Sequence, residues 1–197
     1  MSVGGDAGAS GAEGEIAAQP TIRACVEADV HAIVAIYAHH VLNGLASFEI
    51  VPPDEAENAR RRNEILAHGL PYLVAELDCS VAGYAYAAPY RSRPAYCHTL
   101  EDSVYVDPAA ARRGVGRTLL AALLDACAAL GYRQMIAVIG DSGNAASIGL
   151  HEACGFTQTG LLPSVGYKHR RWVDSVLMQR PLGPGDGAAP EQSGRGD

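Results

Sequence analysis

The stretch EDSVYVDPAAARRGVGR, residues Glu101–Arg117, joins a predicted strand to a basic, glycine-marked turn and then to a helix. Val104–Val106 consists of strand-forming residues, and Pro108 interrupts the strand. An apolar repeat at helical spacing begins at Val115. We therefore expect Arg112–Gly116 to form the turn that leads from a central strand into a helix.

The first turn of this helix is a candidate anion site. Its backbone N–H groups lack partners within the helix and lie at the positive end of the helix dipole. Gly114 and Gly116 let a ligand approach the backbone closely, while Arg112, Arg113 and Arg117 add full charges. A diphosphate group would fit these features, although a plain basic helix start is the alternative interpretation.

Composition and charge indicate a single-domain protein of 197 residues, long enough to bury a sizeable core. No apolar run approaches membrane-spanning length, and the N-terminus lacks the features of a signal peptide, so we expect a cytoplasmic protein without a membrane partner. A net charge of −7 argues against nucleic acid as a partner. The 5 cysteines are scattered among apolar neighbours, which indicates reduced, mostly buried thiols and no metal.

The two ends of the chain differ in composition from the middle. Residues 1–20 contain almost no large apolar side chain, and the tail 183–197 is similar. Neither segment can offset its ordering entropy by burial, so both are predicted to be disordered. The folded domain is then expected to span residues 21–182.

Hydrophobic periodicity predicts an α/β domain with a mixed sheet and helices on both faces. The run Met135–Ile139 is continuously apolar, as expected of a strand covered on both faces. Helices are expected to begin near Glu27, after Asp54, at Val115 and at Asn144. The other expected strands are Thr21–Ala24, Tyr72–Glu76, Val81–Ala88, Phe156–Leu162 and Trp172–Met178.

The strand, turn and helix of Glu101–Arg117 resemble the acetyl-CoA site of the GNAT-type acetyltransferase superfamily, whose pyrophosphate loop reads Gln/Arg-x-x-Gly-x-Gly/Ala. Ala111 departs from the first position of that pattern. Within the superfamily, four stretches in matching order resemble the phosphinothricin N-acetyltransferase family, over about Thr21 to Leu182. These are ASFEIVPPD (Ala46–Asp54), RPAYCHTLEDSVYV (Arg93–Val106), NAASIGLHEACGF (Asn144–Phe156) and VGYKHRRWVDSV (Val165–Val176).

This resemblance implies the V-splayed, mostly antiparallel sheet of about seven strands that is typical of GNAT-type N-acyltransferases. It also implies acetyl-CoA as co-substrate and a homodimer. The implied cofactor-binding residues are Val104, Tyr105, Val106, Arg112, Arg113, Gly114, Val115, Gly116, Arg117, Asn144 and Ser147.

Glu101 is the candidate general base. Forming an amide from a thioester needs a neutral amine, because an ammonium group has no lone pair with which to attack. A partly buried carboxylate has a raised pKa that suits this task, and by resemblance Glu101 takes the family's general-base position. Asp102 should point to the opposite face of the strand. The alternative is that both are solvated strand carboxylates.

Asn144, Ser147 and His151 are spaced so that they line one face of a short helix ending at Gly155. By resemblance, His151 lies where many relatives carry a tyrosine acid near the sulfur, and an imidazole could protonate the leaving thiolate. The alternative is a helix-terminal imidazole stabilised by the helix dipole.

An amino-acid substrate carries a carboxylate, for which a guanidinium is the best-matched partner. Arg91 and Arg93 flank the loop before the central strand, and the resemblance matches them, with Tyr96, to the family's basic residues and tyrosine. It also matches Phe48 to a pocket-lining aromatic residue. The predicted substrate-binding residues are Phe48, Arg91, Arg93, Tyr96 and Ser103.

The predicted function is acetylation of the α-amino group of a small amino acid or analogue, such as phosphinothricin, methionine sulfoximine or methionine sulfone, by direct transfer. An acetylated Cys97 or Cys154 is the competing route, but neither has an evident base. Two rival functions remain: acetylation of a polyamine or a protein N-terminus, and a non-catalytic acyl-CoA-binding module. Arg170 stands where relatives often have glycine, which leaves the shape of one pocket wall open.

Overall fold

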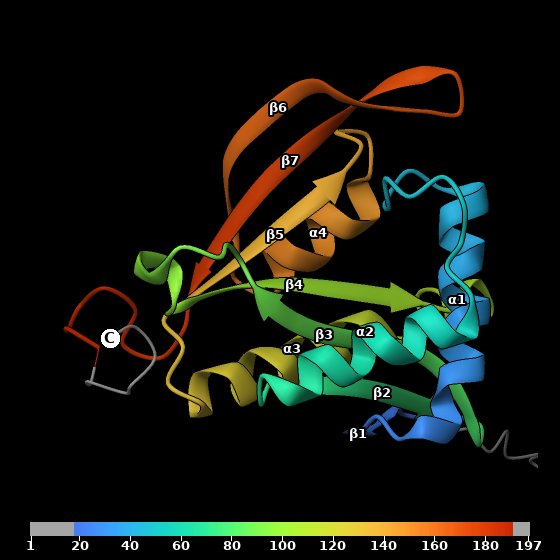
Figure 1. The fold of residues 1–197 in the computed structure, drawn as a ribbon, viewed down its shortest axis with the longest axis horizontal. Helices are drawn as coiled ribbons and strands as arrows, with labels where there is room; N and C mark the ends of the chain where they lie inside the picture. The colour runs from blue at the N-terminus through green and yellow to red at the C-terminus, as the bar shows by residue number, and fades with distance from the viewer. Residues whose placement is uncertain (1–17, 191–197) are drawn as a thin grey trace, which may run out of the picture.

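The computed structural model describes residues 18–190 (Figure 1), so most of the predicted N-terminal tail and the last residues of the C-terminal tail lie outside it. The helices are α1 Val30–Asn43, α2 Glu55–Ala67, α3 Val115–Ala129 and α4 Ala145–Ala153. The strands are β1 Thr21–Ala24, β2 Tyr72–Leu77, β3 Ser80–Pro89, β4 Thr99–Val106, β5 Gln134–Gly140, β6 Thr157–Lys168 and β7 Arg171–Pro181. Single 3₁₀ turns lie at Glu27–Asp29, Pro94–Tyr96 and Pro108–Ala110.

All seven strands described form one sheet in the order β1-β2-β3-β4-β5-β7-β6. The β4–β5 pair is parallel and the other five pairs are antiparallel. The predicted mixed, mostly antiparallel sheet of about seven strands is therefore confirmed.

The sheet splits between β4 and β5. These strands pair only over Thr99–Glu101 and Gln134–Ile136, although β4 continues to Val106 and β5 to Gly140. Beyond Glu101, the edge of β4 that faces β5 has no strand partner. Because buried backbone N–H and C=O groups need hydrogen-bond partners, this split is a place where an extended ligand can bind.

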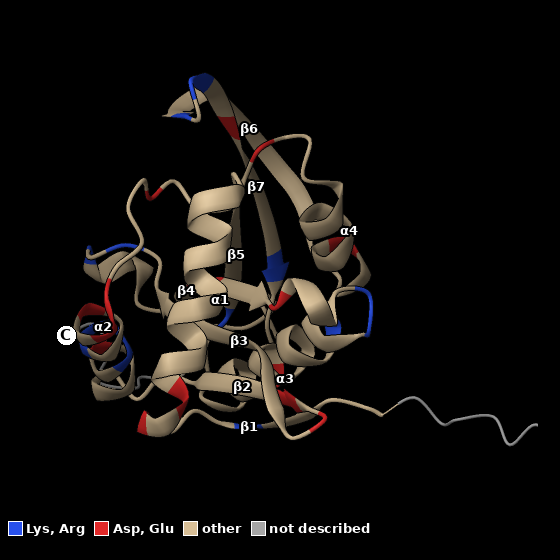
Figure 2. Cartoon of the chain, turned by 90° about the vertical axis from the view of Figure 1, so that its right-hand side faces the viewer, with Lys and Arg blue, Asp and Glu red and all other residues tan. Residues whose placement is uncertain are grey.

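Helices cover both faces of the sheet (Figure 2). Tyr105 of β4 meets Tyr37 of α1 edge to face at 4.9 Å, so one face of β4 packs on α1. On the other face, a Cβ at Gly83 would lie 3.1 Å from Val115 and 3.2 Å from Leu119, so β3 packs closely on α3. The two faces of β4 therefore lie in different surroundings.

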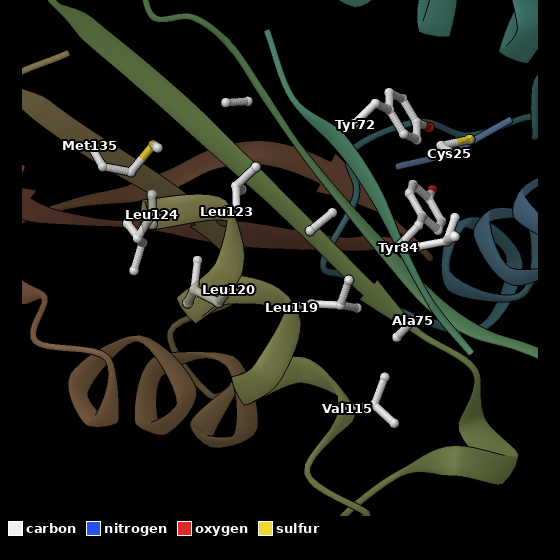
Figure 3. Packing of buried hydrophobic residues seen from close by; sticks show 14 of the residues in the cluster. Cys25, Tyr72, Ala75, Tyr84, Val115, Leu119, Leu120, Leu123, Leu124 and Met135 are labelled. Carbon is white, nitrogen blue, oxygen red and sulfur yellow. The ribbon is translucent and has the colours of Figure 1, made fainter. Parts of the chain in front are cut away.

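The core on the second face is formed by the apolar side of α3 (Figure 3). Of the apolar stripe predicted for this helix, only its last member, Leu130, is not part of the core, because it is the C-cap and is 39% exposed. The buried residues of this helix are Val115, Leu119, Leu120, Leu123, Leu124 and Cys127. Figure 3 shows Val115, Leu119, Leu120, Leu123 and Leu124 on the side of α3 that faces the sheet, with Met135 of β5 near Leu124. Buried apolar residues recur at nearly every turn of α3, so one side of the helix is continuously apolar.

Some elements differ from the prediction. Strand β5 was expected to be covered on both faces, but its residue Val138 is 40% exposed. The reason is that β5 borders the split, so that of its alternating side chains only Met135, Ala137 and Ile139 point into the core. The last two strands are longer than predicted and form a hairpin that extends beyond the rest of the sheet in Figure 1. Cys79 is exposed, because it lies in the β2–β3 turn with φ 62°.

The described part of the C-terminal tail, residues 183–190, forms turns. The guanidinium of Arg133 donates to the Ala189 carbonyl at 3.0 Å and to the Gly185 carbonyl at 3.4 Å, which ties this segment to the domain.

Within residues 18–190, no helix combines the length and the apolarity that a membrane-crossing segment needs.

Candidate active site

A hollow occupies the split between β4 and β5. Residues of both strands, of α4 and of the α1–α2 loop line it. They are Ala46, Asp102, Ser103, Val104, Tyr105, Ala137, Val138, Ile139, Gly140, Asn144, Ser147 and His151. Ser103, Val104, Tyr105, Asn144, Ser147 and His151 were all predicted as site residues, and the split brings them together.

Strand alternation places Glu101 and Asp102 on opposite faces of β4. Glu101 shares its side with Ser103 and Tyr105, and Tyr105 packs against α1. Asp102 shares the other side with Leu100 and contacts α4. The predicted orientation of the two carboxylates is therefore confirmed, with one on each face of the sheet; Asp102 lines the hollow and Glu101 does not.

The Glu101 carboxyl group is half-buried. Burial raises its pKa above the usual value, the Asp102 carboxylate raises it further, and the guanidinium of Arg91 opposes both effects. A carboxylate with a raised pKa binds protons more strongly, which suits a group that removes a proton from an amine.

Asp102 and His151 form a buried pair, with exposures of 7% and 4%. His151 Nε2 lies 3.0 Å from Asp102 Oδ2, and Nδ1 lies 2.7 Å from the Ser147 carbonyl oxygen. Since a carbonyl oxygen only accepts, Nδ1 must carry a hydrogen, and the contact with Asp102 needs a second one. Burial is the largest single effect and by itself would lower the pKa of His151. The hydrogen bond and the charge of Asp102, together with the Ser147 carbonyl, outweigh burial and raise this pKa.

Helix α4 holds this imidazole in place. The Asn144 side chain caps the helix by accepting from the Ser147 N–H at 3.1 Å, as the sequence predicted. The ring of His151 also packs edge to face on Phe156 at 5.0 Å. Both ring nitrogens and the ring face therefore have fixed neighbours, so the imidazole is preorganised.

The start of α3 forms the other end of the site. Gly114 is the N-cap, with φ 81°, and a Cβ there would meet nothing within 4 Å, so the space above the first-turn amides is open. Gly116 instead packs inward, because its Cβ would lie 3.3 Å from Leu150 and 3.4 Å from Val106. Open amides beside basic side chains fit an anionic group such as a diphosphate.

The predicted arginines of this turn differ in their surroundings. Arg113 donates to Asp78 at 3.0 Å, which offsets part of its charge. Arg112 and Arg117 are exposed, and Arg112 takes φ 62° in the turn before Gly114. Arg112 and Arg117 therefore contribute the larger share of positive charge to the anion site.

The predicted substrate-binding residues lie in three places. Ser103 lines the hollow in the split, and Phe48 lies in the α1–α2 loop against Gly140 and Gly166. Arg91 and Tyr96 line a separate hollow near the start of β4, and the Arg91 guanidinium stacks over Tyr90 at 5.0 Å.

Arg93 lies outside the Arg91 hollow. It is exposed as the N-cap of the 3₁₀ turn Pro94–Tyr96.

Arg170 takes φ 62° in the β6–β7 turn, a conformation that favours glycine. Within residues 18–190, no group of three or more His, Cys, Asp or Glu side chains is placed to hold a metal ion.

Asp102 is the site residue that sequence reasoning missed. Strand alternation by itself predicts only that Asp102 faces away from Glu101. A signal was present, because Asp102 interrupts the alternating apolar series Leu100, Val104 and Val106. A carboxylate on the apolar face of a strand requires a partner, and His151 supplies it from 49 residues away.

Comparisons with known proteins agree with this geometry. The acetyltransferase (GNAT) family model matches residues 33–156. Phosphinothricin N-acetyltransferase of Alcaligenes faecalis is 58% identical over 171 residues, which cover 87% of this chain and 87% of the relative. The L-methionine sulfoximine/L-methionine sulfone acetyltransferase of Salmonella typhimurium is 42% identical over 164 residues, which cover 82% of this chain and 94% of the relative.

A solved structure gives the same result. The phosphinothricin acetyltransferase of Sinorhizobium meliloti in complex with AcCoA superposes with a TM-score of 0.86 at 46% identity, covering 89% of this chain and 95% of that one. The predicted fold is thereby confirmed. The chain belongs to the acetyltransferase (GNAT) family and, within it, to the phosphinothricin N-acetyltransferases.

Proposed function

We propose that this acetyltransferase moves the acetyl group of acetyl-CoA directly onto the α-amino group of a small amino acid or analogue. Phosphinothricin, methionine sulfoximine and methionine sulfone are the candidate acceptors, since the relatives are named for them. The observation that carries the proposal is the split between β4 and β5, which has a half-buried carboxylate on one face and a buried histidine on the other.

Acetyl-CoA fits the split by two features of the chain. The edge of Val104–Val106 without a strand partner can form backbone hydrogen bonds with the amide groups of the pantetheine arm, although the Val106 carbonyl oxygen already lies 2.9 Å from His40 Nε2. The open amides at Gly114–Arg117 can receive the diphosphate. Asn144 and Ser147 line the same hollow from α4 and would contact the arm near its thioester end.

Direct transfer needs one proton acceptor and one proton donor. Glu101 would take the proton of the ammonium group, through water, and the neutral nitrogen would then bond to the thioester carbonyl carbon. The carbon–sulfur bond breaks as the tetrahedral intermediate collapses. The departing thiolate would take its proton from His151, whose positive charge Asp102 stabilises. Because both ring nitrogens are hydrogen-bonded, one of the two contacts, with Ser147 or with Asp102, would open for this transfer.

The acceptor's carboxylate would be bound by the arginines that precede β4. Arg91 is the stronger candidate of the two, because it is close enough to Glu101 to lower its pKa. Tyr96 lines the same hollow as Arg91. Arg93 is exposed and would have to turn inward when the acceptor binds.

The cellular setting is inferred from the composition. We place the protein in the cytoplasm, because the cysteines of the described residues are free thiols, as is usual in a reducing compartment.

A binding and turnover series tests the function. Isothermal titration should detect acetyl-CoA binding, and a free-thiol assay should then show CoA release with the three candidate acceptors. Turnover only with polyamines or peptide N-termini would favour the first rival function. Binding without turnover on any amine would favour an acyl-CoA-binding module, and absence of binding would refute the proposal.

Replacing Glu101 by Gln keeps the size of the side chain but removes its capacity to accept a proton. We expect turnover at neutral pH to fall about 10²-fold or more, with acetyl-CoA affinity nearly unchanged. The residual rate should rise with pH as the amine deprotonates by itself, whereas the wild-type rate should level off above the raised pKa of Glu101. Near-normal turnover of this variant would exclude Glu101 as the base.

Replacing Gly114 by Asp places a negative charge above the open amides of α3. The matched control is Gly114→Asn, which has the same shape without charge, and both residues tolerate positive φ better than other side chains. We expect the Asp variant to bind acetyl-CoA at least about tenfold more weakly than the Asn variant, because it repels the diphosphate. Equal affinities in calorimetry would place the diphosphate elsewhere.

Replacing Asp102 by Asn tests the role of the buried pair. The amide can donate to a neutral His151 Nε2, so the fold should survive, but the carboxylate that raises the histidine pKa is lost. In the profile of kcat against pH, the fall on the alkaline side should move to lower pH, because His151 then loses its proton at a lower pH. The shift can be followed as an imidazole titration in NMR spectra, and an unmoved limb would show that His151 is not the acid.

We propose that the protein forms a homodimer through the exposed apolar side chains of the β6–β7 hairpin. Leu161, Leu162, Val165, Tyr167 and Trp172 are between 45% and 65% exposed. A second copy of the chain that packs on this hairpin would bury these exposed side chains. Light scattering at micromolar concentration should give twice the chain mass of 20.6 kDa, and a monomeric mass would contradict this.

A further inference from the structure

Lys168 is the only lysine in the chain, and it is buried. The other 14 of the 15 basic residues are arginines. Lys168 ends β6, beside the tight turn of the β6–β7 hairpin, with only 3% of its surface exposed. A lysine normally keeps its ammonium group in water, so its burial at this position requires a specific partner.

That partner is a backbone carbonyl in the α1–α2 loop. Lys168 Nζ donates to the Ser47 carbonyl oxygen at 2.6 Å, across 121 residues of sequence. Ser47 is itself only 6% exposed. A charge-assisted hydrogen bond between buried groups is stronger than one at the surface, so this contact joins the hairpin firmly to the loop.

The residues around Ser47 are held from other sides as well. The Ser47 hydroxyl lies 2.9 Å from the Tyr37 hydroxyl of α1 and accepts from the Glu49 N–H at 3.2 Å. The Glu49 carboxylate pairs with Arg61 of α2. Ser47 and Glu49 are therefore bound to two helices and one hairpin, and Phe48 lies between them.

Phe48 is seated against two glycines. A Cβ at Gly166 of β6 would lie 2.4 Å from the Phe48 ring, and one at Gly140 of β5 would lie 3.0 Å from it. The Gly140 Cβ would also lie 2.2 Å from the Leu45 carbonyl oxygen. Since real side chains do not approach so closely, these positions accommodate the loop only because they lack side chains.

We propose that Lys168 is a positioning residue that holds Ala46–Glu49 as a fixed wall of the acceptor site. Phe48 is the predicted acceptor-binding residue of this loop, and Ala46 lines the hollow in the split where the thioester would meet the amine. The bond from Lys168 therefore acts on a segment between the acceptor and the acetyl group. Lys168 does not touch the acceptor; it sets acceptor affinity by keeping Ala46 and Phe48 in place. The inference rests on the proposed acetyl transfer to a small amine.

Kinetics of Lys168→Met and Lys168→Gln test the proposal. Methionine has a similar length but no donor, whereas glutamine keeps a neutral donor. For Lys168→Met we expect the acceptor KM to rise about tenfold, the effect of losing one charged hydrogen bond, with acetyl-CoA affinity within about twofold of wild type. Lys168→Gln should recover part of the loss. An unchanged acceptor KM, or equal losses in acceptor and acetyl-CoA binding, would overturn the proposal.

Chemical labelling of the wild-type protein gives a test that does not depend on turnover. The only primary amines of the chain are Lys168 and the α-amino group. With an acetylating N-hydroxysuccinimide ester and peptide mass spectrometry, Lys168 should react at least about tenfold more slowly in the native protein than in guanidinium, because a buried group reacts only on opening. Equal rates would refute the bond to Ser47. If no amine were acetylated by the enzyme, the proposed function would fail while this result still stood.

Discussion

The parting of β4 from β5 after Glu101 is the constraint on which the rest of the site depends. Two parallel strands that separate leave backbone groups without partners in the middle of a sheet, where exclusion of water makes an unpaired group costly. A ligand with its own amide groups can relieve that cost. The glycine-marked start of α3 lies at the end of β4, so the same strand leads from the reacting groups to the anion site.

Two titratable groups lie on opposite faces of the sheet near the split, and the pKa values of both are raised, for different reasons. Burial raises the pKa of Glu101 because it disfavours the carboxylate, whereas Asp102 raises the pKa of His151 because it favours the imidazolium. One group is thereby suited to accept a proton and the other to donate one. Strand alternation keeps them on opposite faces, so they do not exchange protons with each other directly.

Small residues and one buried lysine shape the acceptor end of the site. Gly140 and Gly166 leave room for Phe48 and for the loop backbone, and Lys168 holds that loop by a single carbonyl. A loop bound through Ser47 and Glu49 to two helices and a hairpin forms a wall and not a mobile lid. Selectivity for the acceptor would then be built into the folded state and need no closing motion.

Features governed by neighbours along the chain were predictable from the sequence: the apolar stripe of α3, the Asn144 cap, the turn at Gly114 and the alternation of Glu101 and Asp102. Hydrogen bonding and periodicity within a few residues determine these. Long-range contacts were not predictable. The Asp102–His151 and Lys168–Ser47 bonds join residues 49 and 121 positions apart, and the exposure of Val138 depends on where β4 leaves β5. Only the tertiary structure decides these, because such contacts depend on how whole elements pack.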